Sequence, residues 1–448
     1  MSKRILIIGA GPTGLGAAYR LNELGYDNWH LYEKEAFPGG LAASFKKDGF
    51  TWDVGGHVLF SHYKYFDDYL EKVLEGQYTE LVREAWVWLQ DRFVPYPFQN
   101  NIRYLPKKVI LECVEGLVEA TQNYDPKKKP KNFLQLNQSI LGKGIMKYFM
   151  VPYNKKVWAF PLETMSTNWV GERVSLVNIS KVLENIILEK DEFGWGPNNK
   201  FKFPLNNGIG DIALRVGERI KGNLSLNEKV EKIDTTKKEI TFIDGSKDSY
   251  DHLISSMPLD QFIWKSDLPK PMHTAVKNLK HSGDVIVGIG LKGSVPKKLK
   301  TKCWMYFPES NCPFYRVTVF SNYSPNNVPK GHWSLMAEIS YSTSKKIEKE
   351  TIIEETIKGM LNTKLIESRE KIVSTWSLDV PYGYPTPSLE RDGILNKVQS
   401  ELLKRRVYSR GRFGAWKYEI SNTDHTTMQG VEVVDLILNG VKEKTWSL

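Results

Sequence analysis

Three glycines near the start of the chain have the spacing that lets a backbone loop hold a pyrophosphate. Gly9, Gly11 and Gly14 follow the apolar run Ile5–Ile8 and open a segment with helical periodicity. The first glycine permits a tight turn, the second lets backbone amides approach a phosphate, and the third lets the helix pack on the strand. Glu33 stands 24 residues after Gly9, where a carboxylate accepts the 2′-OH of an adenosine ribose. The pattern predicts a β-α-β unit that binds a dinucleotide.

Two further glycine pairs favour FAD over NAD as that dinucleotide. Gly39-Gly40 comes shortly after the ribose acid, and Gly55-Gly56 precedes His57. A deeply buried FAD needs backbone without side chains against its phosphates and its isoalloxazine ring. We therefore expect FAD as the resident cofactor.

A second constellation predicts an anion site beside the flavin. Arg173, Arg316 and Arg412 stand in aromatic or glycine-rich sequence. A buried guanidinium needs an anionic partner, and its planar fork matches phosphate oxygens. The alternative is an internal salt bridge with Glu172, Glu309 or Glu338.

Aromatic residues supply the other half of this second site. Tyr96-Pro97-Phe98-Gln99 combines rings that can stack on a base with an amide that can read its edge. Trp304 and Tyr306 alternate on a short predicted strand, while Tyr384 and Tyr418 lie in glycine-containing or polar sequence. The set predicts a nucleotide-diphosphate pocket separate from the FAD site.

The elements that must position these residues indicate an α/β fold of discontinuous construction. Short apolar strands and helices near both ends predict a Rossmann-like FAD-binding domain of the glutathione-reductase type, built from residues 1–64, 205–262 and 400–448. Residues 65–204 read as a mainly helical inserted domain. Alternating runs in 263–399 predict an antiparallel β-sheet domain that binds substrate.

Composition narrows the classes of function. The 448 residues carry a net charge of +10, mostly as dispersed lysine, and no DNA- or RNA-binding motif accompanies it. No apolar run reaches the ~20 residues of a membrane helix. Three cysteines without C-x-x-C spacing favour a cytoplasmic protein without disulfides, and no histidine pattern predicts a metal.

Four longer motifs resemble one family, the eukaryotic-type UDP-galactopyranose mutases. They are Gly55-Gly56-His57-Val58-Leu59-Phe60-Ser61-His62, Val94-Pro95-Tyr96-Pro97-Phe98-Gln99-Asn100-Asn101, Gly194-Trp195-Gly196-Pro197-Asn198 and Ser409-Arg410-Gly411-Arg412-Phe413-Gly414. The resemblance extends in order over nearly the whole chain. It implies an isomerase that interconverts UDP-galactopyranose and UDP-galactofuranose with no net oxidation, using FAD in its reduced form.

The resemblance also implies roles for individual residues. Uridine is expected on Tyr96, Phe98, Gln99, Asn154 and Trp158, and the diphosphate on Arg316, Tyr384 and Tyr418. The sugar and flavin are expected beside Arg173, Asn198, Trp304, Tyr306, Arg412 and Asn422. FAD contacts are expected from Gly9, Gly11, Thr13, Gly14, Glu33, Gly39, Gly40, Leu41, Gly55, Gly56, Val230 and Thr423. His57 is expected over flavin N5, and His62 beside a nicotinamide donor. The catalytic group would be His57, Arg173, Arg316, Tyr384 and Tyr418.

Ring contraction requires a nucleophile at the anomeric carbon, and no side chain of this constellation offers one. The N5 atom of reduced flavin fits that role, with NADPH or NADH as a transient reductant. Three alternatives stay open: a true FAD-dependent oxidoreductase of the amine oxidase or desaturase type, a mutase acting on another UDP-sugar, and a redox-dependent UDP-sugar binder. The preferred sugar and the oligomeric state, monomer or homo-oligomer, are also left open.

Overall fold

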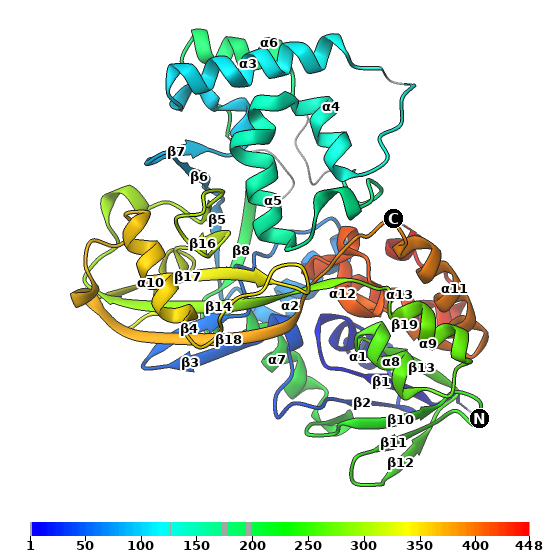
Figure 1. The fold of residues 1–448 in the computed structure, drawn as a ribbon. Coiled ribbons are helices and arrows are strands. Elements are labelled where there is room, and N and C mark those ends of the chain that lie inside the picture. The colour runs from blue at the N-terminus through cyan, green and yellow to red at the C-terminus, as the bar shows by residue number, and fades with distance from the viewer. Residues whose placement is uncertain (1, 126, 172–176, 194–198, 448) are drawn as a thin grey trace.

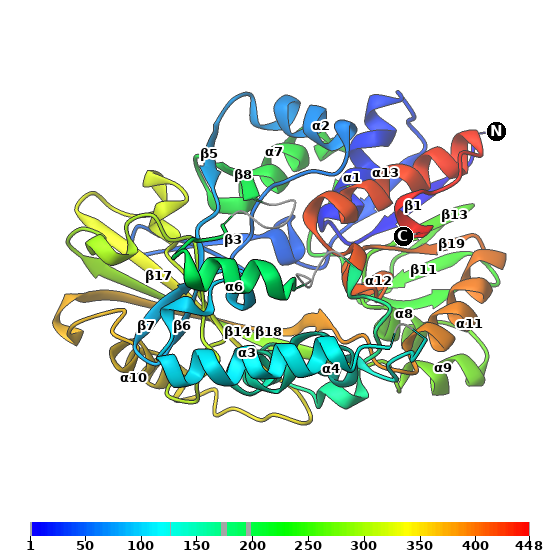
Figure 2. The same cartoon turned by 90° about the horizontal axis from the view of Figure 1, so that it is seen from above.

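Three groups of elements make up the molecule, as the computed structural model in Figure 1 shows. The structure describes residues 2–125, 127–171, 177–193 and 199–447. A parallel sheet with its helices, a larger mostly antiparallel sheet and a cluster of helices lie around a common centre (Figures 1 and 2).

The first group is a five-stranded parallel sheet in the order β19-β13-β1-β2-β9. Its strands are β1 (Ile5–Ile8), β2 (Trp29–Tyr32), β9 (Leu224–Ser225), β13 (His252–Ser255) and β19 (Val407–Ser409). All four residues of β1 are buried, as expected for a strand that is covered on both faces. Segments from both ends of the chain therefore meet in one sheet.

The two faces of β1 pack against different partners. Ile5 and Ile7 share a core with α1 (Pro12–Glu23) and α13 (Thr423–Asn439). Leu6 and Ile8 face the opposite core. That core is formed with β10 (Val230–Asp234), β11 (Glu239–Phe242), α8 (Leu259–Lys265), α9 (Lys270–Val276) and α11 (Arg391–Lys404). β12 (Lys247–Ser249) pairs with β11.

Two glycines let α1 and α13 lie unusually close. A Cβ atom built on Gly430 would stand 2.0 Å from the carbonyl oxygen of Thr13, and one on Gly16 would stand 2.5 Å from that of Thr427. Only residues without a side chain fit at this crossing. The contact holds the last long helix of the chain against the first.

The second group is a seven-stranded sheet in the order β18-β14-β17-β16-β15-β6-β7, with α10 (Ile352–Asn362) beside it. All neighbouring pairs are antiparallel except β15 and β6, which run parallel. The strands are β6 (Ala85–Leu89), β7 (Arg92–Pro95), β14 (His281–Lys292), β15 (Trp304–Tyr306), β16 (Arg316–Thr318), β17 (His332–Tyr341) and β18 (Ile372–Pro385).

The third group consists of helices that cover one end of this sheet. α3 and α4 run side by side (Figure 2). The helices are α3 (Lys107–Gln122), α4 (Phe133–Ile145), α5 (Val151–Trp158) and α6 (Ile179–Ile187). Smaller elements join the groups: α2 (Lys64–Leu74), α7 (Asp211–Arg219), α12 (Gly411–Gly414), the pair β3 (Ser44–Lys47) and β4 (Phe50–Asp53), and the pair β5 (Tyr78–Val82) and β8 (Lys200–Pro204).

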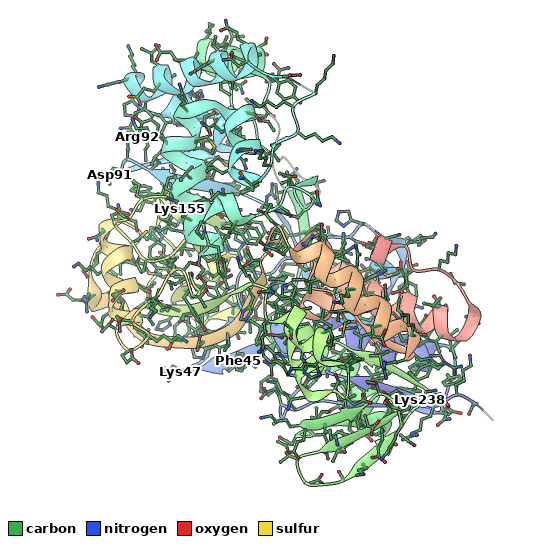
Figure 3. The ribbon with its side chains drawn as sticks, turned by 45° about the vertical axis from the view of Figure 1, so that its right-hand side comes forward. Phe45, Lys47, Asp91, Arg92, Lys155 and Lys238 are labelled. Carbon is green, nitrogen blue, oxygen red and sulfur yellow. The ribbon has the colours of Figure 1, made fainter. Side chains whose placement is uncertain are left out.

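The predicted α/β architecture, with a parallel sheet, inserted helices and an antiparallel sheet, is confirmed. The helical interpretation of residues 65–204 needs a correction, because β6 and β7 from that range belong to the large sheet. They form a hairpin whose two turn residues, Gln90 and Asp91, both have positive φ, and Figure 3 labels Asp91 and Arg92 at its outer end. Such a turn needs no glycine here, so its usual sequence signal is absent.

The domain boundaries themselves stay a prediction. Within the described ranges, no helix has both the length and the apolar character needed to cross a membrane.

The α1–α13 crossing gives a first test. Replacing Gly430 by Ala should push the two helices apart and lower the free energy of unfolding by about 1–3 kcal/mol, a typical cost of overpacking. Thermal unfolding of the purified protein measures this change. Gly393→Ala in α11 is the matched control, because apart from its chain neighbours and its own helix backbone nothing lies within 4 Å of its built Cβ. That variant should be neutral or slightly stabilised, and equal losses in both variants would contradict the packing argument.

Candidate active site

The first glycine loop is shaped as a cradle for an anion. Gly9 leaves β1 with φ of +94°, and a Cβ on Gly14 would stand 1.9 Å from the carbonyl oxygen of Gly9. At Gly11, the residue before α1, nothing lies within 4 Å of the built Cβ. Open space at a helix N-terminus lined by backbone is what a pyrophosphate requires.

The second glycine pair closes the same space. The Gly39 amide donates to the Ala10 carbonyl at 2.8 Å, and a Cβ on Gly40 would lie 3.3 Å from the Gly11 Cα. Both glycines have positive φ, +129° and +54°. The two loops thus bring bare backbone together, as predicted for a dinucleotide.

Glu33 lies at this cradle, at the end of β2. Its carboxylate accepts the Ala10 amide at 2.7 Å and the Glu35 amide at 3.0 Å. A carboxylate has further lone pairs for a ribose hydroxyl. The Glu228 amide donates to the Glu33 carbonyl at 2.8 Å, so β10 with Val230 begins close by. These residues fit the adenosine half of FAD.

A cavity of about 320 Å³ lies at the junction of the three groups. It joins the flavin-side loops to the large sheet and the helical cluster. Sixteen of the predicted site residues border it: Leu41, Gly55, Gly56, His57, Tyr96, Gln99, Asn154, Trp158, Trp304, Tyr306, Arg316, Tyr384, Arg412, Tyr418, Asn422 and Thr423. Residues far apart in the sequence are therefore brought to one cavity.

Arg316 stands in the wall of this cavity and is already paired. Its Nε and one terminal nitrogen donate to the two carboxylate oxygens of Glu338 at 2.6 and 2.5 Å. The internal salt bridge considered as an alternative is therefore present. Burial lowers the pKa of Arg316, but the charge and hydrogen bonds of Glu338, with the nearby tyrosines Tyr384 and Tyr315, together make the net shift upward. The guanidinium is charged at the cavity surface.

Arg412 supplies a second cation with a different environment. Its terminal nitrogens donate to the carbonyl oxygens of Gly383 at 3.2 Å and Ser421 at 3.3 Å, and its guanidinium lies 5.3 Å from the Tyr384 ring centroid. Within the described residues it forms no ion pair with a carboxylate. An anionic ligand would satisfy that charge.

His57 is neutral in this setting. Burial, followed by the charge of Arg412, lowers the pKa of His57 to about 4. Its Nδ1 atom is buried and has no hydrogen-bond partner among the described residues. The preceding Gly56 lies so close to the sheet that a Cβ there would stand 2.5 Å from the Thr318 hydroxyl and 2.8 Å from Trp304 Nε1. The loop thus presents backbone and an uncharged imidazole to the cavity.

Aromatic rings form the other walls. Tyr96 and Tyr306 lie with centroids 5.2 Å apart, and Trp158 and Tyr418 with centroids 4.9 Å apart. Tyr384 stands 5.8 Å from Tyr418. These flat surfaces suit a base and a sugar.

Several predicted residues are placed elsewhere. Phe98 is fully buried, stacks on Phe149 in the helical core and is not among the residues that border the cavity. Its expected contact with uridine stays a prediction. Its neighbours Tyr96 and Gln99 face the cavity, which leaves Phe98 to anchor their segment. Thr13 donates its hydroxyl to the Thr426 carbonyl at 2.8 Å, inside the α1–α13 contact. Arg173 and Asn198 lie outside the described residues.

His62 also lies away from the cavity. Its Nδ1 and that of His425 contact the two carboxylate oxygens of Asp424 at 2.7 and 3.1 Å. Burial alone would raise the pKa of Asp424, but these two hydrogen bonds lower it well below its usual value. The ring nitrogens and carboxylate oxygens of these three residues lie as close together as the ligands of a metal ion would. The hydrogen bonds to Asp424 already account for their arrangement.

Sequence reasoning missed three polar residues of the cavity wall, Arg83, Tyr153 and Asp284, and named Glu338 only as a possible partner of an arginine. Arg83 stands between Val82 and Glu84, a pattern typical of an exposed strand, yet it is buried. Asp284 lies in β14 directly before the apolar run Val285–Leu291, and a charged residue at the head of such a run was the available signal.

Comparison with known proteins defines the class. A sequence profile of the family described as flavin containing amine oxidoreductase matches residues 12–430. Two curated relatives share shorter stretches. A zeta-carotene-forming phytoene desaturase of Myxococcus xanthus is 47% identical over 57 residues, which is 13% of this chain and 11% of the relative. A coproporphyrinogen III oxidase of Staphylococcus aureus is 20% identical over 291 residues, 59% of this chain and 62% of the relative. The chain thus spans less than two thirds of these relatives' lengths, but the profile match places it in the flavin-dependent amine oxidoreductase class.

One solved structure gives a narrower placement. The crystal structure of a reduced UDP-galactopyranose mutase is 46% identical and has a TM-score of 0.97. The alignment covers all of this chain and 96% of that one. The chain belongs to the UDP-galactopyranose mutase family.

One buried carboxyl group beside the cavity predicts a dependence of stability on pH. Asp53 directly precedes Val54, which borders the cavity, and its side chain is fully buried. Burial raises the pKa of Asp53 to about 7, although the Ser44 hydroxyl and the Ile209 amide donate to it and oppose the shift. The carboxyl group of Asp53 has a pKa of about 4 in the unfolded chain and about 7 in the folded protein. Between about pH 4 and pH 7 this group is therefore ionised in the unfolded chain but still protonated in the folded protein. Raising the pH through this window therefore costs up to about 1.4 kcal/mol of stability per pH unit.

Asp53→Asn should remove this part of the decline. Thermal unfolding with FAD bound, measured across the same pH window, should show a flatter profile for the variant than for the unchanged protein. Asp27→Asn, at an exposed site, is the control and should leave the profile unchanged. Parallel profiles for all three proteins would contradict a raised pKa at Asp53.

Proposed function

We propose that this protein interconverts UDP-galactopyranose and UDP-galactofuranose, an isomerisation without net oxidation. The observation that carries the proposal is the convergence of Arg316, Arg412, Tyr384 and Tyr418 on one cavity beside the dinucleotide loops. The similarity over the full chain to a reduced UDP-galactopyranose mutase supports the same reaction. An oxidoreductase that acts on an apolar substrate would not need two arginines in the wall of its substrate channel.

The diphosphate is proposed to bind between the arginines and the tyrosines. Arg412 donates to two backbone carbonyl oxygens and would also donate to the phosphate oxygens of the substrate. Arg316 would add a charge held in place by Glu338, with Arg173 as a further cation. Tyr384 and Tyr418 hydroxyls would donate to the same oxygens, which gain negative charge as the sugar–phosphate bond breaks.

The nucleoside and the sugar are proposed to occupy the aromatic walls. Tyr96 would stack on uracil, with Gln99 and Asn154 at its edges and Trp158 nearby. Trp304 and Tyr306, with Asn198 and Asn422, would orient the galactose ring. The loop that carries His57 would lie against the cofactor, and the imidazole of His57, which is neutral at physiological pH, would add no charge there.

When bound, reduced FAD supplies the nucleophilic N5 atom that the anomeric carbon requires. The chain's own part is to hold C1 of the sugar near that atom, to exclude water and to stabilise the departing UDP. One dinucleotide fingerprint is present in the sequence. NADPH or NADH is therefore proposed as a transient donor that visits the sugar cavity. His62, which does not border that cavity, would contact the part of the donor that extends beyond it.

The finer assignments follow from the motifs. We infer from the four motifs that the protein is of the eukaryotic type of the family. The three cysteines without C-x-x-C spacing favour a cytoplasmic location. We infer no nucleic-acid partner, because the sequence contains no DNA- or RNA-binding motif. The boundaries of the three domains are proposed as the sequence predicts them. The three cysteines, Cys113, Cys303 and Cys312, are buried and unpaired.

The direct test is turnover of UDP-galactose followed by chromatography, with and without NADPH. Conversion to a second UDP-hexose should require the reductant and consume far less than one donor per product. Stoichiometric consumption of the donor would instead indicate an oxidoreductase of the amine oxidase or desaturase type. Binding without turnover would indicate a UDP-sugar binder, and faster turnover of UDP-N-acetylgalactosamine or UDP-arabinopyranose would change the substrate.

Arg412→Ala tests the anion site. Removing this cation should lower kcat of the dithionite-reduced enzyme by about 10²-fold or more, because the developing charge on UDP loses a donor. Absorbance of the bound flavin checks that the variant keeps FAD. Arg405→Ala, which removes an ion pair with Glu401 on α11, is the matched control and should leave kcat unchanged. Normal turnover by Arg412→Ala would remove this residue from the proposed site.

A further inference from the structure

A second acid lies behind the arginine–carboxylate pair of the cavity wall. Asp284, on β14, is buried and borders the cavity. The register of β14 against β18 shifts between Ser282 and Asp284, which marks a bulge. Bulges re-aim side chains beside active sites. The bulge lies on β18, where the chain advances four residues, from Val380 to Tyr384, against two on β14. Asp284, on the regular strand, stands next to Tyr315.

The Tyr315 hydroxyl stands between two carboxyl groups. Its oxygen lies 2.7 Å from Asp284 Oδ2 and 3.0 Å from Glu338 Oε2. A hydroxyl carries one proton and can donate to only one of them. If both acids were ionised, the other contact would join two oxygens with no proton between them. One additional proton, on Asp284 or Glu338, satisfies both contacts.

The surroundings assign that proton to Asp284. Glu338 accepts from Arg316 through both oxygens and from the Gly56 amide at 3.2 Å. Asp284 has the Tyr315 hydroxyl alone, and its Oδ1 atom is buried without a partner among the described residues. An ionised carboxylate in that position would lack the donors that buried charge needs. A neutral acid leaves only a carbonyl oxygen unpaired, at a smaller cost.

The charged groups that face Asp284 agree with this assignment. Glu338 repels its ionised form, while Arg316 and Lys345 attract it; within the described part of the chain neither cation forms an ion pair with Asp284. Burial, followed by the charge of Glu338, raises the pKa of Asp284 well above its ordinary value. Burial also raises the pKa of Tyr315, so its hydroxyl stays protonated.

We propose that Asp284 is a neutral carboxylic acid that donates to Tyr315 and thereby keeps the Tyr315 proton on Glu338, so that one negative charge, and not two, is paired with Arg316. Asp284 is a positioning residue: it acts on the cavity through Tyr315 and Glu338. Asp284 thus donates to Tyr315 and Tyr315 donates to Glu338, while Arg316 donates to Glu338 from the other side. The summed charge of these four side chains is zero, which leaves the charge of Arg412 uncompensated for an anionic ligand.

Infrared spectroscopy of the FAD-bound protein tests the protonation state directly. A protonated carboxyl group has a carbonyl stretching band that a carboxylate lacks. The difference spectrum of the unchanged protein minus Asp284→Asn at neutral pH should contain this band. Absence of the band would mean that Asp284 is ionised and would overturn the proposal. Asp53→Asn, which alters a separate buried acid, is the matched control and should leave the Asp284 band in place.

Two further variants test the coupling. In Glu338→Gln the repelling charge is gone and the Tyr315 proton is free to turn to Asp284, so Asp284 should ionise and its band should be lost. Persistence of the band in that variant would overturn the shared proton. Should Asp284→Asn fail to fold, Tyr315→Phe reads the same acid. Loss of its hydrogen-bond acceptor should move the band to higher frequency, and an unmoved band would contradict the contact.

No substrate enters these measurements. Their outcome is therefore independent of whether the protein acts on UDP-galactose. A missing band with normal mutase turnover would reject the neutral acid alone, whereas a band without turnover would reject the proposed reaction alone.

Discussion

The ion pair between Arg316 and Glu338 joins the two functional parts of the molecule. The two residues face each other across β16 and β17, and Glu338 also accepts the amide of Gly56 in the loop that precedes His57. A buried carboxylate without its arginine would be strongly unfavourable, and so would the reverse. The pair therefore fixes the position of the flavin-side loop against the large sheet. The cavity between them takes its shape from that attachment.

The same pair explains why an arginine can be held at a cavity wall before any ligand arrives. A free guanidinium in that position would be drawn toward the nearest available oxygen and lose its orientation. Glu338 holds two of its nitrogens in a planar fork, and Tyr384 lies at 3.5 Å from one of them. Ordering a free arginine side chain would lower the affinity for the ligand, and because Arg316 is already ordered this loss is avoided.

Local features of the sequence were sufficient for much of the fold. The glycine spacing defined the β1-α1-β2 unit and its cradle, because Gly9 takes a positive φ, Gly11 leaves open space at the helix N-terminus and Gly14 packs on the Gly9 carbonyl. Helices such as α3 and α13 followed from periodicity. The hairpin of β6 and β7 was not predicted, since its turn carries Gln90 and Asp91 in place of glycine, and its partner β15 lies more than 200 residues further along the chain.

The site shows the same division between local and distant information. Tyr96 and Arg412 could be singled out from their own neighbours in sequence. Phe98 could not be separated from Tyr96 by residue type, because which of two nearby rings faces a cavity depends on the helices that pack behind them. Arg83 and Asp284 needed the fold, since their burial arises from strands distant in sequence. The pairing of Arg316 was open to two readings until its register with Glu338 was known.

The close crossing of α1 and α13 has a consequence for biosynthesis. The parallel sheet needs β1 from the first residues and β19 from beyond residue 400, and α13 completes the packing on α1 (Figure 1). A ribosome adds residues one at a time, and segments fold as they emerge. Until α13 has been synthesised, the early β-α-β unit lacks the helix that packs against α1. The dinucleotide cradle can therefore reach its final form only after α13 has been synthesised, so flavin capture must await that helix.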